Sequence, residues 1–283
     1  MAVVISLFGL SVYALFFLSE LKAQKIWLAI KDLLAYSTYP AKKFPERTND
    51  YFRETVTSIA ENISRTVADI RQFEAEYKRP QNSVTLLAVS KKHSAESIEV
   101  AAQHGIHNFG ENYLQEALDK ILALKTLPLI WHFIGPIQSN KTKAIAENFD
   151  WVHSVDREKI ARRLSEQRSG DQVALNVCVQ VNLSAELSKS GTTLKNALEV
   201  CALVAKLPRL TLRGLMAIPA PQSNFQDQRT NFNQLAVEFR ALAALYPTMD
   251  TLSMGMSNDF EAAIAEGSTM IRIGTALFGS RPI

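Results

Sequence analysis

The sequence predicts an α/β protein whose eight parallel strands close into a TIM-type (β/α)8 barrel, preceded by one extra helix. Short apolar runs alternate with segments in which apolar residues recur every three to four positions, from residue 50 to the end of the chain. Strands separated by helices are typical of parallel β–α–β units, and eight such units can close a barrel. The 283 residues, of which 47% are hydrophobic and 21% charged, suffice for one large packed domain.

The extra helix is expected over residues 50–78, where apolar residues from Phe52 to Phe73 lie on one helical face. Pro80 interrupts this pattern, and the apolar, β-branched run at residues 84–89 is typical of a buried parallel strand. Further strands are expected at residues 107–110, 130–134, 151–154, 174–182, 210–218, 251–254 and 270–273. Helices are expected between them at residues 95–104, 113–124, 141–148, 157–167, 194–206, 225–245 and 260–266.

A doubly wound open sheet is the alternative arrangement of alternating strands and helices. It would place a glycine-rich turn after its first strand. In this chain that turn reads Ser90-Lys91-Lys92-His93 and contains no glycine. The sequence therefore favours the closed barrel over the open sheet.

Residues 49–283 are expected to form the barrel domain, because the pattern is complete there without the preceding residues 1–48. Within that extension, residues 2–18 carry no charge and are at the short limit for crossing a bilayer. Unlike a signal peptide, they have no positive residue before them and no small-residue cleavage site after them. Two interpretations stay open. One is a membrane anchor that leaves the barrel in the cytoplasm, as the lysines after it indicate, and the other is a dispensable extension from a start codon placed too far upstream.

The charge balance and the cysteines bear on partners and compartment. Lys plus Arg exceed Asp plus Glu by only three (31 against 28) and form no sustained basic run, so nothing indicates a nucleic-acid partner. Cys178 and Cys201 fit small buried apolar residues and give no disulfide framework, which favours a reducing, cytoplasmic compartment. The expected helices show no wide apolar stripe on their exposed sides, so we expect a monomer.

The five histidines lack the spacings that are typical of a zinc site, so no metal is expected. No nucleophile-elbow pattern indicates a Ser-His-Asp triad. The histidines are therefore expected to be structural, with His132 as the exception to follow, because it lies on an expected strand near the barrel mouth.

Active sites of this fold lie at the carboxyl ends of the strands. The first strand ends at Ser90 and Lys91, so the Lys91 side chain can project into the barrel mouth. Burial disfavours the charged form of a lysine, and the neutral amine is a nucleophile that can form an imine with an aldehyde. Lys92 has the same chemistry and points the other way, so the residues alone do not decide between the two. A solvated lysine at a strand end is the alternative for either.

The loops after the seventh and eighth strands are expected to bind a phosphate, as they do in many barrels. Ser257 offers a hydroxyl and backbone N–H groups just before the helix expected from Phe260. Gly274 permits close backbone approach and Thr275 supplies a second hydroxyl, where a helix start would add its positive dipole end. A glycine also suits an ordinary strand-to-helix turn, but two donor-rich turns on neighbouring strands favour a phosphate site.

Several strings of the sequence match one known family in the same order. They are LLAVSK (86–91), FGENYLQE (109–116), WHFIGPIQSNK (131–141), SKSG (188–191), RGLMAIPAP (213–221), LSMGMSND (252–259) and STMIRIGTALFG (268–279). With these strings, residues 49–283 resemble the YggS-like pyridoxal phosphate homeostasis proteins, whereas residues 1–48 depart from the family. The resemblance implies a barrel like the N-terminal domain of alanine racemase that binds pyridoxal 5′-phosphate (PLP).

The resemblance also implies how the cofactor is attached. The lysine of the LLAVSK string, Lys91, would form the Schiff base, which selects it over Lys92. Arg272 would lie near the pyridine nitrogen. A cation there disfavours protonation of that nitrogen and weakens the ring as an electron sink.

The remaining contacts follow from the same matching of strings. Ser257, Gly274 and Thr275 would hold the phosphate. Asn112 would lie beside the cofactor ring, and Met216 would form part of the pocket wall.

Two functions from different classes are consistent with this site. The first is a PLP-binding protein that buffers the cofactor or delivers it to PLP-dependent apo-enzymes, without catalytic turnover. The second is an amino-acid racemase, which needs acid and base groups on both faces of its substrate. Racemases of this fold take part of that site from a second domain and a partner subunit. No such domain follows the barrel here, so the homeostasis role is favoured.

Overall fold

The computed structural model describes residues 50–183 and 190–279. The predicted extension 1–48, with its apolar run 2–18, lies outside these residues, and the division of the chain at this point stays a prediction. Among the described helices, none is long and apolar enough to cross a membrane.

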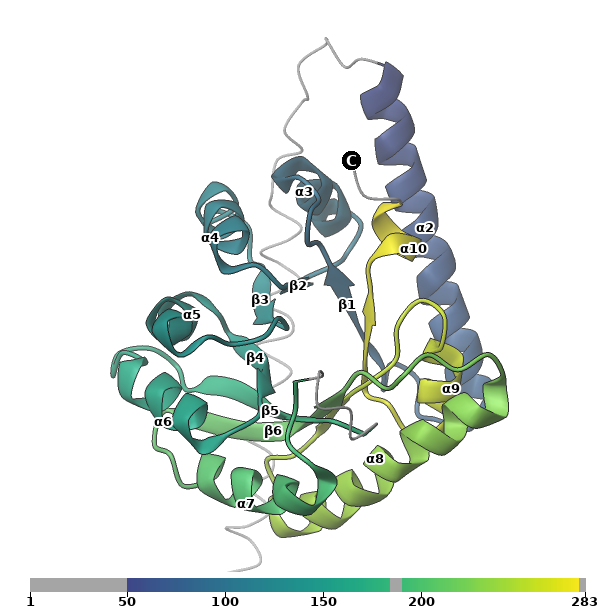
Figure 1. Cartoon of the computed structure of the whole chain (residues 1–283). Coiled ribbons are helices and arrows are strands. Elements are labelled where there is room, and N and C mark those ends of the chain that lie inside the picture. The colour runs from purple at the N-terminus through teal and green to yellow at the C-terminus, as the bar shows by residue number, and fades with distance from the viewer. Residues whose placement is uncertain (1–49, 184–189, 280–283) are drawn as a thin grey trace, which may run out of the picture. The chain divides into compact units, whose positions relative to one another are not determined.

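Eight parallel strands form a closed barrel in chain order (Figure 1). Each strand pairs with the next, and β8 pairs with β1, which closes the sheet. The strands are β1 (Thr85–Val89), β2 (Asn108–Glu111), β3 (Ile130–Phe133), β4 (Trp151–Val155), β5 (Leu175–Val181), β6 (Leu210–Ala217), β7 (Thr251–Ser253) and β8 (Met270–Ile273). The predicted fold class is confirmed.

Helices connect consecutive strands and surround the barrel (Figure 1). They are α3 (Ala95–Gln103), α4 (Leu114–Ala123), α5 (Thr142–Asn148), α6 (Glu158–Gln167), α7 (Leu194–Val204), α8 (Phe225–Leu245) and α9 (Phe260–Ala265). Helix α2 (Asp50–Glu76) precedes β1, α10 (Thr275–Phe278) follows β8, and a 3-10 turn, η1 (Ser139–Lys141), leads into α5. The expected alternation is confirmed, with each predicted boundary within two residues of the observed one.

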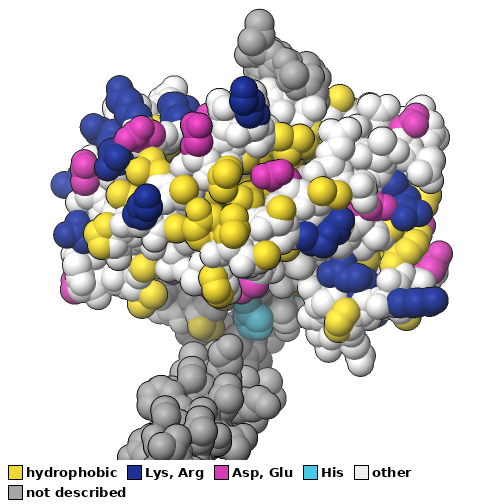
Figure 2. Space-filling model, turned by 90° about the horizontal axis from the view of Figure 1, so that it is seen from below, with side chains coloured by type: hydrophobic (Ala, Val, Ile, Leu, Met, Phe, Trp, Pro, Cys, Tyr) yellow, Lys and Arg dark blue, Asp and Glu magenta, His cyan; other side chains and the backbone are white. Residues whose placement is uncertain are grey.

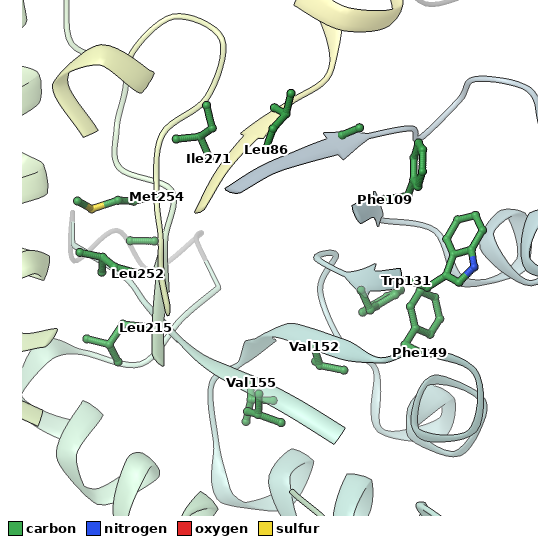
Figure 3. Close-up of a cluster of buried hydrophobic side chains, with 14 of the residues drawn as sticks. Leu86, Phe109, Trp131, Phe149, Val152, Val155, Leu215, Leu252, Met254 and Ile271 are labelled. Carbon is green, nitrogen blue, oxygen red and sulfur yellow. The ribbon is translucent and has the colours of Figure 1, made fainter. Parts of the chain in front are cut away.

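The main apolar core lies between the barrel and its helices. Side chains of a strand alternate between its two faces, so every second residue of a barrel strand faces the helices. Figure 3 shows part of this layer, including Phe109, Trp131 and Leu252 from three different strands. Burial of one large apolar side chain contributes about 1.5–3 kcal/mol, so this layer attaches the helices firmly to the barrel.

The interior of the barrel is partly polar, in contrast to this outer layer. Trp151, Cys178 and Met216 form a small apolar cluster that is separate from the main core. Beside it lie buried or half-buried polar side chains from five strands, namely Asn108, His132, His153, Ser253 and Arg272. Groups of this kind are stable inside a protein only when they are hydrogen-bonded.

Helix α2 and the turn after it contact the two helices that follow β7 and β8. Helix α2 lies alongside α9 and α10 (Figure 1). The Asn62 amide donates to the carbonyl oxygen of Leu277 at 3.1 Å, and the Arg79 guanidinium donates to that of Ile264 at 3.0 Å. The helices that follow β7 and β8 are therefore held from outside the barrel by α2 and the turn after it.

One face of the surface combines apolar and charged side chains. Figure 2 shows apolar side chains in the centre of this face, with basic and acidic ones intermixed around them. Large apolar side chains exposed on α7 and α8 include Leu198, Val237 and Leu245. The expected monomer stays a prediction.

Candidate functional site

The predicted site residues come from one continuous arc of the barrel. The strands β6, β7, β8, β1 and β2 are neighbours in that order. Each contributes at its carboxyl end or in the turn that follows. The residues are, along this arc, Met216, Ser257, Arg272, Gly274, Thr275, Lys91 and Asn112.

Lys91 opens the turn between β1 and α3. It is half-buried, whereas Lys92 is exposed and has a left-handed backbone with φ of 65°. The strand pattern of the sequence does not predict this difference in exposure between Lys91 and Lys92. It fits Lys91, rather than Lys92, as the lysine of a partly enclosed site.

A buried ion-pair cluster holds the backbone on both sides of Lys91. The Lys120 ammonium donates to the Ser90 carbonyl oxygen at 2.8 Å and to the carboxylates of Glu111 and Glu116 at 2.8 and 2.6 Å. The Ser90 hydroxyl donates to Glu111 at 2.7 Å, and the Lys92 backbone N–H donates to Glu116. We define these four side chains, Ser90, Glu111, Glu116 and Lys120, as the turn clamp.

The sequence analysis missed the turn clamp, although one signal for it was present. Glu111 ends the short strand β2 with a charged side chain, and a charged residue at a buried strand end needs a partner. Glu111 is fully buried, and burial raises the pKa of its carboxyl while the nearby Lys120 ammonium opposes that shift. Lys120, nine residues later on α4, is the partner.

Gly274 brings the end of β8 against the end of β1. A Cβ atom on Gly274 would lie 3.2 Å from the Val89 carbonyl oxygen and 3.4 Å from the Val89 Cβ. Only hydrogen fits there without displacement, because contacts this close are rare for a real Cβ. The predicted phosphate turn therefore lies beside the strand that leads into Lys91.

The two predicted phosphate turns present backbone donors at short helices. Helix α9 has six residues and α10 has four, and Gly274 is the N-cap of α10. The first N–H groups of a helix have no partner within it, so both turns offer donors, although helices this short add little dipole. The Ser257 side chain is half-buried and that of Thr275 is exposed.

Arg272 is a buried cation with neutral partners. Its guanidinium donates to the Ser253 carbonyl oxygen at 2.7 Å, the Ser253 hydroxyl at 2.9 Å and the Ala217 carbonyl oxygen at 2.9 Å. Burial lowers the pKa of Arg272 to about 10, so it stays charged at neutral pH. Within the described residues no carboxylate forms an ion pair with it, although Asp259 exerts an opposing influence. This site suits an acceptor atom or an anion.

Asn112 has a fixed backbone and a side chain available for a ligand. Its carbonyl oxygen lies so close to Gly135 that a Cβ there would overlap it, and the Ser154 hydroxyl in turn donates to the Gly135 carbonyl oxygen at 2.6 Å. The Asn112 Oδ1 atom is buried, and no donor from the described residues reaches it. A buried polar atom without a partner costs about 1–3 kcal/mol, so a ligand that donates to Oδ1 would relieve that cost.

Met216 lies on β6, where it is fully buried and paired in register with Ser253 of β7.

His132 also lies in the interior, but not at the mouth where we expected it. Its Nε2 atom contacts Asn108 Oδ1, at the start of β2, at 3.0 Å. In the described ranges, no group of three His, Cys, Asp or Glu side chains could hold a metal ion.

A cavity of about 300 Å³ opens at the opposite, amino-terminal end of the barrel. Its walls come from the first residues of the strands, among them Thr85, Asn108 and Thr251. None of the predicted site residues lines it. The candidate site therefore rests on side-chain chemistry at the carboxyl ends and not on this cavity.

Comparisons with known proteins identify the family of this chain. Residues 62–282 match the family model described as alanine racemase, N-terminal domain. A pyridoxal phosphate homeostasis protein of Pseudomonas aeruginosa is 54% identical over 226 residues, covering 80% of this chain and 97% of that protein. The protein of that name from Escherichia coli K12 is 51% identical over 229 residues, covering 80% of this chain and 98% of that protein.

Solved structures show the same relationship. PipY of Synechococcus elongatus, solved with PLP bound, is 35% identical, covers 78% of this chain and 100% of its own, and superimposes with a TM-score of 0.66. Alanine racemase of Corynebacterium glutamicum, at 19% identity and a TM-score of 0.56, shares the fold. The chain therefore belongs to the alanine racemase N-terminal domain family and, within it, to the pyridoxal phosphate homeostasis proteins.

Proposed function

We propose that this protein binds PLP covalently through Lys91 and serves intracellular PLP homeostasis, as a buffer or donor of the cofactor. The observation that carries the proposal is the convergence of three features on adjacent strands. A half-buried lysine follows β1, and two donor-rich turns follow β7 and β8. On β8 lies a buried cation that forms no ion pair with a carboxylate of the described residues. PLP has the matching groups, namely an aldehyde, an acceptor nitrogen and a phosphate.

The residues present fit the cofactor one by one. Lys91 would hold the aldehyde carbon as a Schiff base. The phosphate would accept hydrogen bonds from the turns that contain Ser257, Gly274 and Thr275. Asn112, whose Oδ1 atom lacks a donor among the described residues, would lie beside the ring.

The ring would lie over Met216, with its nitrogen toward Arg272. When bound, PLP supplies an electron sink for amino-acid chemistry. A guanidinium opposite the ring nitrogen disfavours protonation there and so weakens that sink. The site would hold the cofactor well and use it poorly, which suits storage or delivery better than turnover.

The racemase is the alternative, and the names of the similar proteins do not favour it. We propose that PLP-dependent apo-enzymes receive the cofactor, that the protein works in the cytoplasm and that it is a monomer. Transfer would appear as faster reactivation of an apo-enzyme by the loaded protein than by the same concentration of free PLP.

The attachment is tested by the visible spectrum of the purified protein with PLP, using Lys91→Ala and the matched control Lys92→Ala. Wild type and Lys92→Ala should show the Schiff-base band, and Lys91→Ala should lose it. A band that persists in Lys91→Ala would refute the assignment. Steady turnover of L- or D-amino acids well above that by free PLP would refute the non-catalytic role.

A further inference from the structure

Five side chains form one continuous line of hydrogen bonds through the barrel. The Arg272 guanidinium contacts the Ser253 hydroxyl at 2.9 Å, and that hydroxyl contacts Nδ1 of His153 at 2.9 Å. Nε2 of His153 contacts Nδ1 of His132 at 2.9 Å, and Nε2 of His132 contacts Oδ1 of Asn108 at 3.0 Å. We call these five residues the interior relay.

The relay crosses the barrel rather than following its wall. Ser253 lies on β7 and His153 on β4, and β5 and β6 separate these strands in the sheet. Their contact must therefore pass through the interior. His132 and His153 are both 0% exposed, and the ring of Trp151 stacks on that of His132 with centroids 5.3 Å apart. Both imidazoles are thus fixed in position.

The end at Arg272 permits one direction of donation through the whole relay, from Arg272 to Asn108. A guanidinium can only donate, so the Ser253 oxygen accepts from it. The Ser253 proton is then available for Nδ1 of His153. A neutral imidazole that accepts at Nδ1 must carry its proton at Nε2, so His153 donates to His132 in the same way.

The end at Asn108 requires the same direction. Its Oδ1 atom can only accept, so His132 must carry its proton at Nε2. Burial keeps both rings neutral, because it lowers the pKa of His132 to about 3 and that of His153 well below its usual value. The reverse direction would need a flipped Asn108 amide and would leave the Ser253 proton without its acceptor.

We propose that His153 and His132 are positioning residues for Arg272, acting through Ser253 to hold the guanidinium as a fixed cation facing the cofactor nitrogen. This inference rests on the proposed PLP function and deepens it. A hydroxyl that donates to an imidazole becomes a better acceptor, since hydrogen bonds in a chain polarise one another. The relay therefore orients Arg272 without a carboxylate, which would cancel part of its charge.

The first test needs no cofactor. Histidine ¹⁵N NMR of the full-length PLP-free protein should show two buried, neutral rings with the proton on Nε2, assigned by their loss in His153→Gln and His132→Gln. Two Nδ1–H rings, or charged rings at neutral pH, would overturn the relay direction and with it the proposal.

The second test uses PLP labelled with ¹⁵N in the ring. In wild type the ring nitrogen should resonate at the unprotonated position near neutral pH. His153→Leu breaks the relay and should shift the resonance toward the protonated position. His153→Gln can accept and donate at once, so it should restore the wild-type value.

Cys178→Ala is the matched control, because it also removes volume inside the barrel but lies outside the relay. It should leave the resonance unchanged. An identical resonance in wild type and His153→Leu would refute the positioning role while PLP binding stands. A shift in Cys178→Ala as large as that in His153→Leu would also refute it, and failure of the wild type to bind PLP would refute the proposed function instead.

Discussion

Removing the ammonium of the turn clamp should destabilise the protein strongly. In Lys120→Met, three hydrogen bonds of 2.6–2.8 Å are lost. The Glu111 carboxylate, which is fully buried, then keeps its hydrogen bond from Ser90 and loses the Lys120 ammonium. Breaking a buried ion pair from one side costs about 3–5 kcal/mol. We expect a loss in this range in the free energy of unfolding.

The double variant Glu111→Gln/Lys120→Met separates the energy of the Glu111–Lys120 ion pair from that of its surroundings. Without the Glu111 carboxylate no fully buried charge is left unpaired, because Glu116 is partly exposed. The double variant should therefore recover at least about 1 kcal/mol relative to Lys120→Met alone. Urea unfolding followed by circular dichroism measures all the variants, with Lys143→Met as a control for an exposed lysine paired with Glu147. A loss below about 1 kcal/mol in Lys120→Met, or strict additivity of the two changes, would refute the clamp.

Three further predictions follow from particular contacts. Gly274→Ala should lower PLP affinity more than it lowers stability, because a methyl group 3.2 Å from the Val89 carbonyl oxygen must displace the phosphate turn. A PLP titration that gives the variant the same affinity as the wild type would contradict this. His132 and His153 have pKa values lowered by burial, so the folded state binds fewer protons than the unfolded state once the pH falls below about 6.5. Stability should therefore be lost on acidification, by about 2 kcal/mol for His132 alone between about pH 6.5 and 5. His153 adds to this loss, so His153→Gln should show a shallower pH dependence in urea unfolding. Cys178 and Cys201 are buried, and burial raises the pKa of both thiols, that of Cys201 to about 12. A thiol reagent should therefore modify them only after unfolding. Rapid labelling of the folded protein would contradict this.

The fold could be predicted almost completely from the sequence, because its signals are local. Continuous apolar runs such as residues 84–89 and 174–182 become strands that are buried on both faces, and the periodic segments between them become helices. The short helix α10 was foreseen only as a helix start, since four residues do not complete two helical turns. The order of the strands then follows from the right-handed β–α–β connection.

The candidate site could be predicted in part. Lys91, Ser257, Gly274 and Thr275 stood out because they follow apolar strands, and the structure brings the turns that contain them to adjacent strands. Their contacts with PLP stay predictions. The choice between Lys91 and Lys92 needed either family resemblance or the three-dimensional difference in exposure.

The interior relay could not be foreseen, because it joins residues far apart in the sequence. His153 and Ser253 are 100 positions apart and lie on strands that are not neighbours. Periodicity indicates which side of a strand a residue occupies, but not which residue faces it across the barrel. For the same reason His132 was expected at the mouth, whereas its ring bonds to Asn108 at the start of β2.

The site of covalent attachment is the most direct test of this account. The purified full-length protein is incubated with PLP, reduced with borohydride, digested and mapped by mass spectrometry. The account predicts one pyridoxyl group on the peptide that contains Lys91 and none on Lys92. A label on Lys92 or on any other lysine, with Lys91 unmodified, would contradict it.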